Sequence, residues 1–405
     1  MDVDFDEIQP RVGTQSIKWD YASVDGVLEL RRHDPDEAVE HALLPMWVAD
    51  MDFRPAEPIL QALTGRLEGV LGYTRLGIEH YEAISSWVKE RHGWNVSTDW
   101  IMPTIGTLPI VNLAIQVFTK PGDAVIVQPP VFYPIPKAAE NNGRVVLEDP
   151  LRLEDGRYHI DFVDLAERAA DPRCKMLLLC SPHNPVGRVW SPDELRRLGE
   201  ICVEHDLLLL SDELHSDLSY SWADFVSIGA VDEQLHERII VCSGPSKAFN
   251  MPGLKAAYAI VPNAGIRAEL TQGLQNLDLL FSVDAVSTLA LRTAYQEGGD
   301  WLRQLLDYLE GNLAFLNEFL LEELPMISIV QPDATFLVWL DCRQLDLQPE
   351  ELRRLFVDEA RVYAEIGNSY GAQGEGFVRL NIGCSRQLLA SALTRLHQAV
   401  RRELP

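Results

Sequence analysis

The chain has 405 residues, a formal net charge of −26 at pH 7 and an isoelectric point near 4.7. A chain this acidic repels the phosphates of nucleic acids and of anionic membranes, so we expect neither as a partner. Hydrophobic residues make up 47% and charged residues 24%, as is ordinary for a soluble globular protein. The length suggests about two to three domain-sized units.

The six cysteines form no Cys-x-x-Cys pair, and most lie in or beside apolar runs. They are expected to be buried, reduced thiols, and no metal site is expected. The acidic N-terminus lacks the apolar segment of a secretory signal, and no apolar run reaches the roughly 18 residues that span a membrane. These features favour the cytoplasm.

An irregular segment over residues 1–51 precedes an alternation of short apolar runs and helical patterns. The runs predict buried strands at 123–130, 143–150, 174–182, 205–213, 238–244 and 255–262. Ser191 and Pro192, followed by two acidic residues, indicate the start of a helix over 191–205. This alternation predicts an α/β domain at 52–295, with a mostly parallel sheet covered by helices on both faces.

The remainder of the chain, 296–405, has a different pattern. Residues 300–325 predict one long amphipathic helix, and strand-like and helical segments alternate after it. We expect a smaller α+β domain here, joined by the N-terminal segment 1–51.

Polar side chains follow three of the predicted strands. They are the amide of Asn184, the carboxylate of Asp212 and the amine of Lys247. Ligands of open α/β sheets bind beyond the carboxyl ends of the strands, so these groups are expected to meet. A Gly-Thr turn at Gly106 enters an apolar helix whose free N–H groups could hold a phosphate. Together these groups suit pyridoxal 5'-phosphate.

Three segments resemble the fold-type I pyridoxal phosphate enzymes of the class I/II aminotransferase superfamily: "PHNPVGRVW", "SDELHSDL" and "SKAFNMPGLK". Four more are similar to the MalY/PatB-type carbon–sulfur β-lyases, the cystathionine β-lyase group: "WVADMDF", "GYTRLG", "TFLVWLDCR" and "GEGFVRLNIGCSR". The resemblance runs from about residue 16 to about residue 400.

The resemblance implies roles around the cofactor ring. Lys247 would form the Schiff base, Asp212 would keep the pyridine nitrogen protonated, and Asn184 would hydrogen-bond the phenolic oxygen. His215 falls where relatives carry a second ring-side group, or it only packs there. Phe132 occupies the place of an aromatic residue that stacks on the ring.

The resemblance also implies a phosphate site. Backbone N–H groups of Gly106, Thr107 and Leu108 would cradle the phosphate, and Ser246 and Lys255 are further candidates. The family's usual Pro-Gly-Val-Val is replaced here by Ile-Gly-Thr-Leu, which changes side chains more than backbone.

Other matched positions concern the substrate and a second subunit. Tyr73 resembles the tyrosine that reaches the neighbouring subunit's phosphate, which implies a homodimer with shared active sites. Arg379 would bind the α-carboxylate of an amino-acid substrate through a bidentate fork, and Ala49, through its backbone N–H, would close the substrate side. Tyr133 is expected to touch the substrate and act in catalysis, unless it and Phe132 are core residues.

The expected reaction is α,β-elimination from cystathionine or a related cysteine S-conjugate, which yields a thiol, pyruvate and ammonia. The same residues allow aminotransfer if Lys247 returns the proton to the cofactor. Another pyridoxal phosphate reaction, or a regulator that binds a transcription factor, remains an alternative. Phe132, Tyr133, Tyr363 and the 13–33 segment are the candidates for shaping the pocket of the β-substituent.

Overall fold

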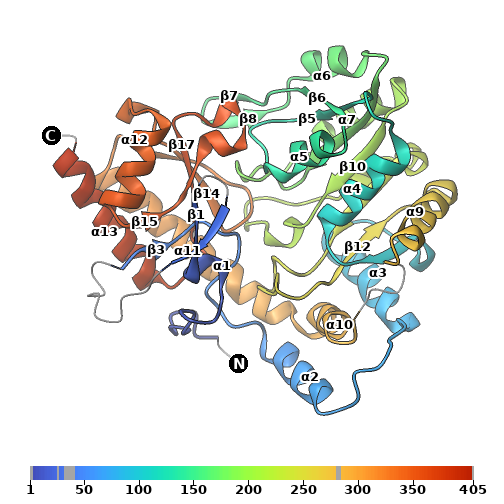
Figure 1. Cartoon of the computed structure of the whole chain (residues 1–405), viewed down its shortest axis with the longest axis horizontal. Coiled ribbons are helices and arrows are strands. Elements are labelled where there is room, and N and C mark those ends of the chain that lie inside the picture. The colour runs from blue at the N-terminus through green and yellow to red at the C-terminus, as the bar shows by residue number, and fades with distance from the viewer. Residues whose placement is uncertain (1–2, 25–26, 32–41, 280–283, 404–405) are drawn as a thin grey trace. The chain divides into compact units, whose positions relative to one another are not determined.

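The computed structural model describes residues 3–24, 27–31, 42–279 and 284–403, and the chain forms two compact units (Figure 1). The larger unit comprises Pro55–Arg303 and Asp333–Thr335. The smaller unit comprises Met1–Arg54, Gln304–Pro332 and Phe336–Pro405. The domain boundaries expected from the sequence, 51/52 and 295/296, compare with 54/55 and 303/304 in this division. Part of the 13–33 segment lies outside the described residues.

The larger unit is built on a seven-stranded sheet with the strand order β4-β12-β11-β10-β9-β5-β6. In that order, the strands are Ile101–Thr104, Ala257–Ile260, Ile239–Ser243, Leu208–Asp212, Cys174–Cys180, Ala124–Val127 and Val145–Glu148. The pairs from β11 through to β6 are parallel, whereas β12 is antiparallel to both of its neighbours. The predicted mostly parallel sheet is thus confirmed.

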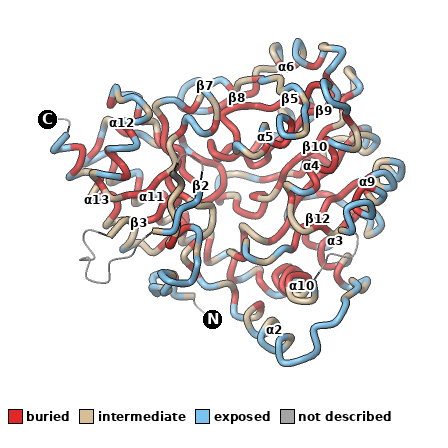
Figure 2. The backbone as a smooth tube through the Cα atoms, viewed as in Figure 1, coloured by how far each residue is buried: buried red, intermediate tan, exposed pale blue. Residues whose placement is uncertain are grey.

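Burial differs between the middle and the edge of this sheet. Every residue of β5 (Figure 2) and of β11 is buried, as apolar runs covered by helices require. The prediction of a buried strand at 143–150 is wrong, because both ends of β6 are exposed and its middle is half-buried. β6 lies at the edge of the sheet, where solvent reaches one side of the strand.

Helices surround this sheet and connect its strands. They include α2 (Glu57–Leu67), α3 (Ile78–His92), α4 (Thr107–Phe118), α5 (Pro134–Asn141), α6 (Phe162–Ala169), α7 (Pro192–Glu204), α9 (Ala264–Asn276) and α10 (Ser287–Glu297). The start predicted for α7 is confirmed by a capping box. Ser191 Oγ accepts from Glu194 N, and the Glu194 side chain accepts from Ser191 N.

Residues 333–335 belong to the larger unit although they are distant from it in sequence. Asp333 is buried and pairs with Arg188 at 2.9 Å and with Arg157 at 2.8 Å. Thr335 N donates to Leu218 O at 2.9 Å. The sequence alternation gave no sign of this return, since it depends on contacts more than a hundred residues apart.

The smaller unit contains a four-stranded antiparallel sheet with the order β13-β14-β17-β16. In that order, these strands are Ser328–Val330, Leu337–Asp341, Phe377–Asn381 and Glu365–Ile366. The long helix α11 (Gly299–Glu323) agrees with the amphipathic helix predicted at 300–325, and α13 spans Arg386–Glu403.

The N-terminal segment is more ordered than the irregular chain that the sequence predicts. It contains a helical turn, α1 (Ile17–Asp20), and a hairpin of β1 (Tyr21–Val24) with β2 (Val27–Leu30). β3 (Leu44–Pro45) pairs in parallel with β15 (Val362–Tyr363). These elements are too short to show a clear hydrophobic period.

All six cysteines are buried and none is in a disulfide. Across the residues that the structure describes, no helix is both long enough and apolar enough to cross a lipid bilayer.

Candidate active site

The parallel register brings three strand ends together in the larger unit. Asp212, the last residue of β10, is level with Cys180 of β9 on one side and Cys242 of β11 on the other. The segments that carry Asn184 and Lys247 therefore leave the sheet beside Asp212, at the same edge. This is the juxtaposition that the sequence predicts for the amide, the carboxylate and the amine.

Asp212 is a buried carboxylate with two hydrogen bonds. Its Oδ1 accepts from Leu214 N at 3.2 Å, and its Oδ2 accepts from Thr107 Oγ1 at 3.2 Å. Burial raises the pKa of the Asp212 carboxyl to about 6, while both hydrogen bonds and the charge of Lys247 act in the opposite direction. A cation placed against this carboxylate would stabilise its ionised form.

The start of α4 offers backbone donors close to Asp212. Among the described residues, the N–H groups of Thr107 and Leu108 have no acceptor, as is normal for the first turn of a helix. The third expected donor differs, because Gly106 N already donates to Thr104 Oγ1 at 3.1 Å. Thr107 and Leu108 are thus the two N–H groups left to hold an anion at this helix terminus.

The segment after β9 holds Asn184 beside Phe132. Asn184 is buried, and its carbonyl oxygen accepts from Phe132 N at 2.9 Å. Phe132 is partly buried against the core of the larger unit, which agrees in part with the alternative that it is a core residue. Tyr133, whose ring centroid lies 5.5 Å from that of Phe132, is 49% exposed, which does not fit a core residue.

The segment after β11 carries Ser246, Lys247 and Lys255. It turns tightly, because Phe249 N donates to Pro245 O and Met251 N donates to Ser246 O, both at 2.9 Å. Ser246 and Lys247 are half-buried in this turn, whereas Lys255 is exposed. A Lys255 contact with a phosphate therefore has less support from this chain than the other predicted contacts.

Gly244 explains why a small residue precedes this turn. A Cβ atom at Gly244 would lie 3.0 Å from Ala256 O and 3.1 Å from Ala257 Cα. A side chain at position 244 would therefore require the backbone at Ala256 and Ala257 to move by a few tenths of an ångström.

His215 is buried, and it lies three residues after Asp212 on the segment leaving β10. Two buried acids of this segment were not singled out from the sequence. Glu213 accepts from Ile228 N at 3.1 Å, and burial raises the pKa of its carboxyl to about 7. Asp217 accepts from Trp87 Nε1 at 2.9 Å and bonds His92 Nε2 at 2.8 Å. Both tie the segment to its surroundings, and only their place in "SDELHSDL" could have indicated them.

Tyr73 lies in the connection between α2 and α3 and is fully exposed, with a relative accessibility of 111%. Val70, at 86%, and Leu71, at 57%, are exposed beside it. Exposed large hydrophobic side chains in succession are typical of a surface that another chain covers.

The substrate-side candidates belong to the smaller unit. Arg379 is buried on β17, and its Nη2 donates to Trp47 O at 2.6 Å. Ala49 lies in the segment that follows Trp47 and is half-buried. The hydroxyl of Tyr363 bonds the backbone of Ser23, which ties this pocket candidate to the N-terminal hairpin.

Taken by unit, the residues fit the groups of pyridoxal phosphate. Asp212 suits a cationic ring nitrogen, the N–H groups of Thr107 and Leu108 suit a phosphate, and the amine of Lys247 suits an aldehyde. Across the described residues, no group of three or more His, Cys, Asp or Glu side chains could hold a metal ion.

Residues 46–396 match the family model described as aminotransferase class I and II. The chain is 40% identical over 400 residues to cystathionine beta-lyase PatB of Bacillus subtilis (98% of this chain, 100% of that protein). It is 32% identical over 400 residues to protein MalY of Escherichia coli (98% and 99%). The crystal structure of cystalysin from Treponema denticola, which contains a pyridoxal 5'-phosphate cofactor, matches with a TM-score of 0.92 and 33% identity, covering 99% of this chain and 100% of that one.

Proposed function

Because the chain belongs to the class I and II aminotransferase family, we propose that it is a pyridoxal phosphate-dependent carbon–sulfur β-lyase. Its substrate is cystathionine or a related cysteine S-conjugate, and its products are a thiol, pyruvate and ammonia. The observation that carries this proposal is the 40% identity, along nearly the whole chain, to a cystathionine beta-lyase.

The larger unit holds the cofactor in this proposal. Lys247 joins it covalently, Asp212 accepts a hydrogen bond from its ring nitrogen, and Asn184 donates to its phenolic oxygen. The phosphate is held by Thr107, Leu108 and Ser246, with Gly106 shaping the turn and Lys255 a weaker candidate. Phe132 stacks on the ring, and His215 packs beside it. When bound, the cofactor supplies an electron sink for negative charge on the α-carbon of the substrate.

Residues of the chain orient the substrate and move its proton. Arg379 and the backbone N–H of Ala49 bind the α-carboxylate, and the amine of Lys247 removes the α-proton. The sulfur substituent then leaves the β-carbon as a thiolate, and hydrolysis of the remaining fragment gives pyruvate and ammonia. Tyr133, exposed beside Phe132, is placed at the substrate.

Aminotransfer is the second candidate, because the matched family model carries that name and the cofactor residues serve both reactions. The two reactions differ in where the α-proton goes and in what they require. An aminotransferase needs a keto-acid acceptor and retains the sulfur in its product. A β-lyase needs no acceptor and releases the sulfur as a thiol.

A product assay on a panel of sulfur amino acids tests the proposal. With L-cystathionine and no added keto acid, the holoenzyme should release pyruvate, ammonia and free thiol in equal amounts. Keto acid formed only when an acceptor keto acid is present, with no free thiol, would favour aminotransfer instead.

We further place the protein in the cytoplasm, as a homodimer in which Tyr73 reaches the phosphate of the partner's cofactor. The unpaired buried thiols support a reducing compartment, and the exposed Val70, Leu71 and Tyr73 support a covered surface.

Mixing two inactive variants tests the shared site. Tyr73→Ala and Lys247→Ala should each be inactive at limiting cofactor, but mixed dimers carry one site with both residues intact. Random mixing should restore up to about a quarter of wild-type activity, because half of the dimers are mixed and half of their sites are whole. No recovery after verified subunit exchange, or a fully active monomer in sedimentation, would contradict the shared site.

A further inference from the structure

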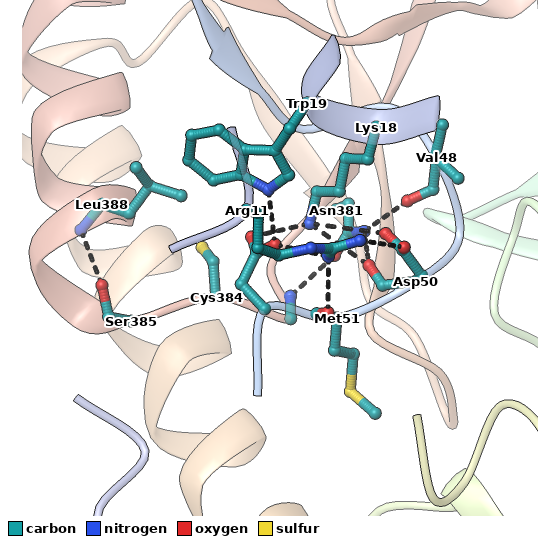
Figure 3. Close-up of polar contacts among 12 residues, drawn as sticks. Arg11, Lys18, Trp19, Val48, Asp50, Met51, Asn381, Cys384, Ser385 and Leu388 are labelled. Atoms are coloured by element: carbon teal, nitrogen blue, oxygen red, sulfur yellow. Dashed lines mark hydrogen bonds and ion pairs between the residues drawn. The ribbon is translucent and has the colours of Figure 1, made fainter. Parts of the chain in front are cut away.

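In the smaller unit, side chains donate hydrogen bonds to the backbone carbonyl oxygens of the segment that contains Ala49. Asn381 Nδ2 donates to Val48 O at 2.6 Å and to Asp50 O at 2.7 Å. Asn381 thus ties the segment to β17 (Figure 3), and Arg379, which donates to Trp47 O, ties it to the same strand. We call residues 47–52 the carboxylate strip.

Lys18 is the least expected of the strip's partners. Its side chain is 0% exposed, which is rare for lysine. Its Nζ donates to Asp52 Oδ2 at 2.8 Å and to Asp50 O at 3.2 Å, and lies 4.0 Å from Asp50 Oδ1. The Lys18 carbonyl also accepts from Trp47 Nε1 at 3.0 Å. Lys18 therefore bonds the first residue of the strip, Trp47, and the last, Asp52.

Arg11 completes a charge-balanced cluster with Lys18, Asp50 and Asp52. Its Nη1 donates to Met51 O at 3.0 Å and to Asp52 Oδ1 at 2.8 Å, and its Nη2 donates to Asp50 Oδ2 at 2.7 Å. Two cations thus face two carboxylates. Figure 3 shows Arg11 and Lys18 beside Asp50 and Met51 of the strip. Pairing of this kind is what allows charged groups to be buried.

These contacts fix the direction of particular N–H groups. In a trans peptide, the C=O of one residue and the N–H of the next point in opposite directions. Asn381, by holding Val48 O, therefore fixes the direction of the Ala49 N–H. Lys18 and Asn381 together donate to Asp50 O, which by the same geometry fixes the direction of the Met51 N–H.

We propose that Lys18 is a positioning residue for the substrate α-carboxylate, acting with Asn381 through the carboxylate strip. Asn381 sets the direction of the Ala49 N–H through Val48 O, while Lys18 holds Asp50 O and the Asp52 carboxylate of the same strip. The Trp47 carbonyl of this strip is bound to Arg379. Lys18 does not touch the substrate. This inference rests on the proposed function, since it assumes that Ala49 and Arg379 receive a carboxylate.

The test compares the holoenzyme of the wild type with Lys18→Met and with the charge-balanced Lys18→Met/Asp52→Asn. The second variant removes one cation and one carboxylate, so Arg11 and Asp50 remain paired. KM and kcat are measured with L-cystathionine. Dissociation constants for L-alanine and L-alaninamide are measured from the absorbance of the bound cofactor, and their ratio reports recognition of the carboxylate alone.

In both variants KM should rise about tenfold, the effect of one charged hydrogen bond, while kcat changes less than about threefold. The preference for L-alanine over L-alaninamide should fall by about the same factor, with cofactor retention unchanged. Arg379→Met should lower the preference further than either Lys18 variant, because it removes the charged partner of the carboxylate. Leu316→Ala, which opens the core of the same unit at a fully buried position, should lower Tm and leave the ratio unchanged.

A folded Lys18→Met/Asp52→Asn variant with wild-type KM and an unchanged ratio would overturn the proposal and leave Lys18 a stabilising residue. If neither Lys18 variant folds, Asn381→Ser gives the deciding ratio, since it removes the other hydrogen bond to Asp50 O. The experiment distinguishes failure of the proposed function from failure of the positioning role. A wild type that releases no pyruvate but prefers L-alanine, with the preference lost in the variants, would refute the lyase and support the positioning role.

Discussion

Replacing Lys247 with alanine is expected to lower turnover at least about a thousandfold, because the amine both joins the cofactor and moves the α-proton. Borohydride reduction of the holoenzyme followed by peptide mapping should place the label on Lys247. The position of this residue in the half-buried turn after β11, at the edge where Asp212 ends β10, is the reason for the expectation.

Lys255 offers the matched control, since it lies on the same segment but is exposed. Lys255→Ala should retain the covalent label and most of the turnover. A label on Lys255 or on any other lysine, or full turnover in Lys247→Ala, would refute the assignment of the attachment site.

Asp212→Asn is expected to lower turnover about a hundredfold or more, which is about 3 kcal/mol of activation free energy. The substitution keeps the size of the side chain and removes its charge, so the ring nitrogen loses its anionic partner. Lys247 and the N–H groups of Thr107 and Leu108 remain, so cofactor affinity should fall far less than turnover. Titration with the cofactor measures its affinity, and single-turnover kinetics measure the rate.

Glu213→Gln is the control for Asp212→Asn. Glu213 is the next residue along and is also buried, and that burial raises the pKa of its carboxyl to about 7. Its carboxylate accepts hydrogen bonds from Ser211, Ser227 and Ile228, so turnover should stay within a few-fold of the wild type. Near-normal turnover in Asp212→Asn with bound cofactor would make Asp212 a structural residue.

The family resemblance seen in the sequence is confirmed by the matched family model and by the relatives, and the α/β fold is confirmed by the sheet. The assignments of individual site residues stay predictions. The structure gives less support to two predicted phosphate contacts, because Gly106 N already donates to Thr104 Oγ1 and Lys255 is exposed.

The sequence alone indicated six of the seven strands of the larger sheet and the three polar groups at the strand ends, whereas β4 was not among the predicted strands. Short apolar runs between amphipathic helices specify a parallel sheet, and parallel strands end at one edge. Asn184, Asp212 and Lys247 could therefore be brought together without coordinates. Lys18 and Asp52 are different. Their pairing depends on an N-terminal segment with no hydrophobic period, folded onto a strip whose carbonyls also bind β17, more than three hundred residues away.

Only the tertiary structure decided which polar groups meet across such distances. The side chain of Thr107 hydrogen-bonds Asp212, which is 105 residues away in the sequence, and the side chain of Asn381 hydrogen-bonds Val48 O, which is 333 residues away. It also decided that β6 is an exposed edge and that Asp333 returns to Arg188 in the larger unit. Local sequence patterns report which face of an element is apolar. They carry no information on which distant donor will satisfy a buried carbonyl or carboxylate, because that follows from the packing of the whole unit.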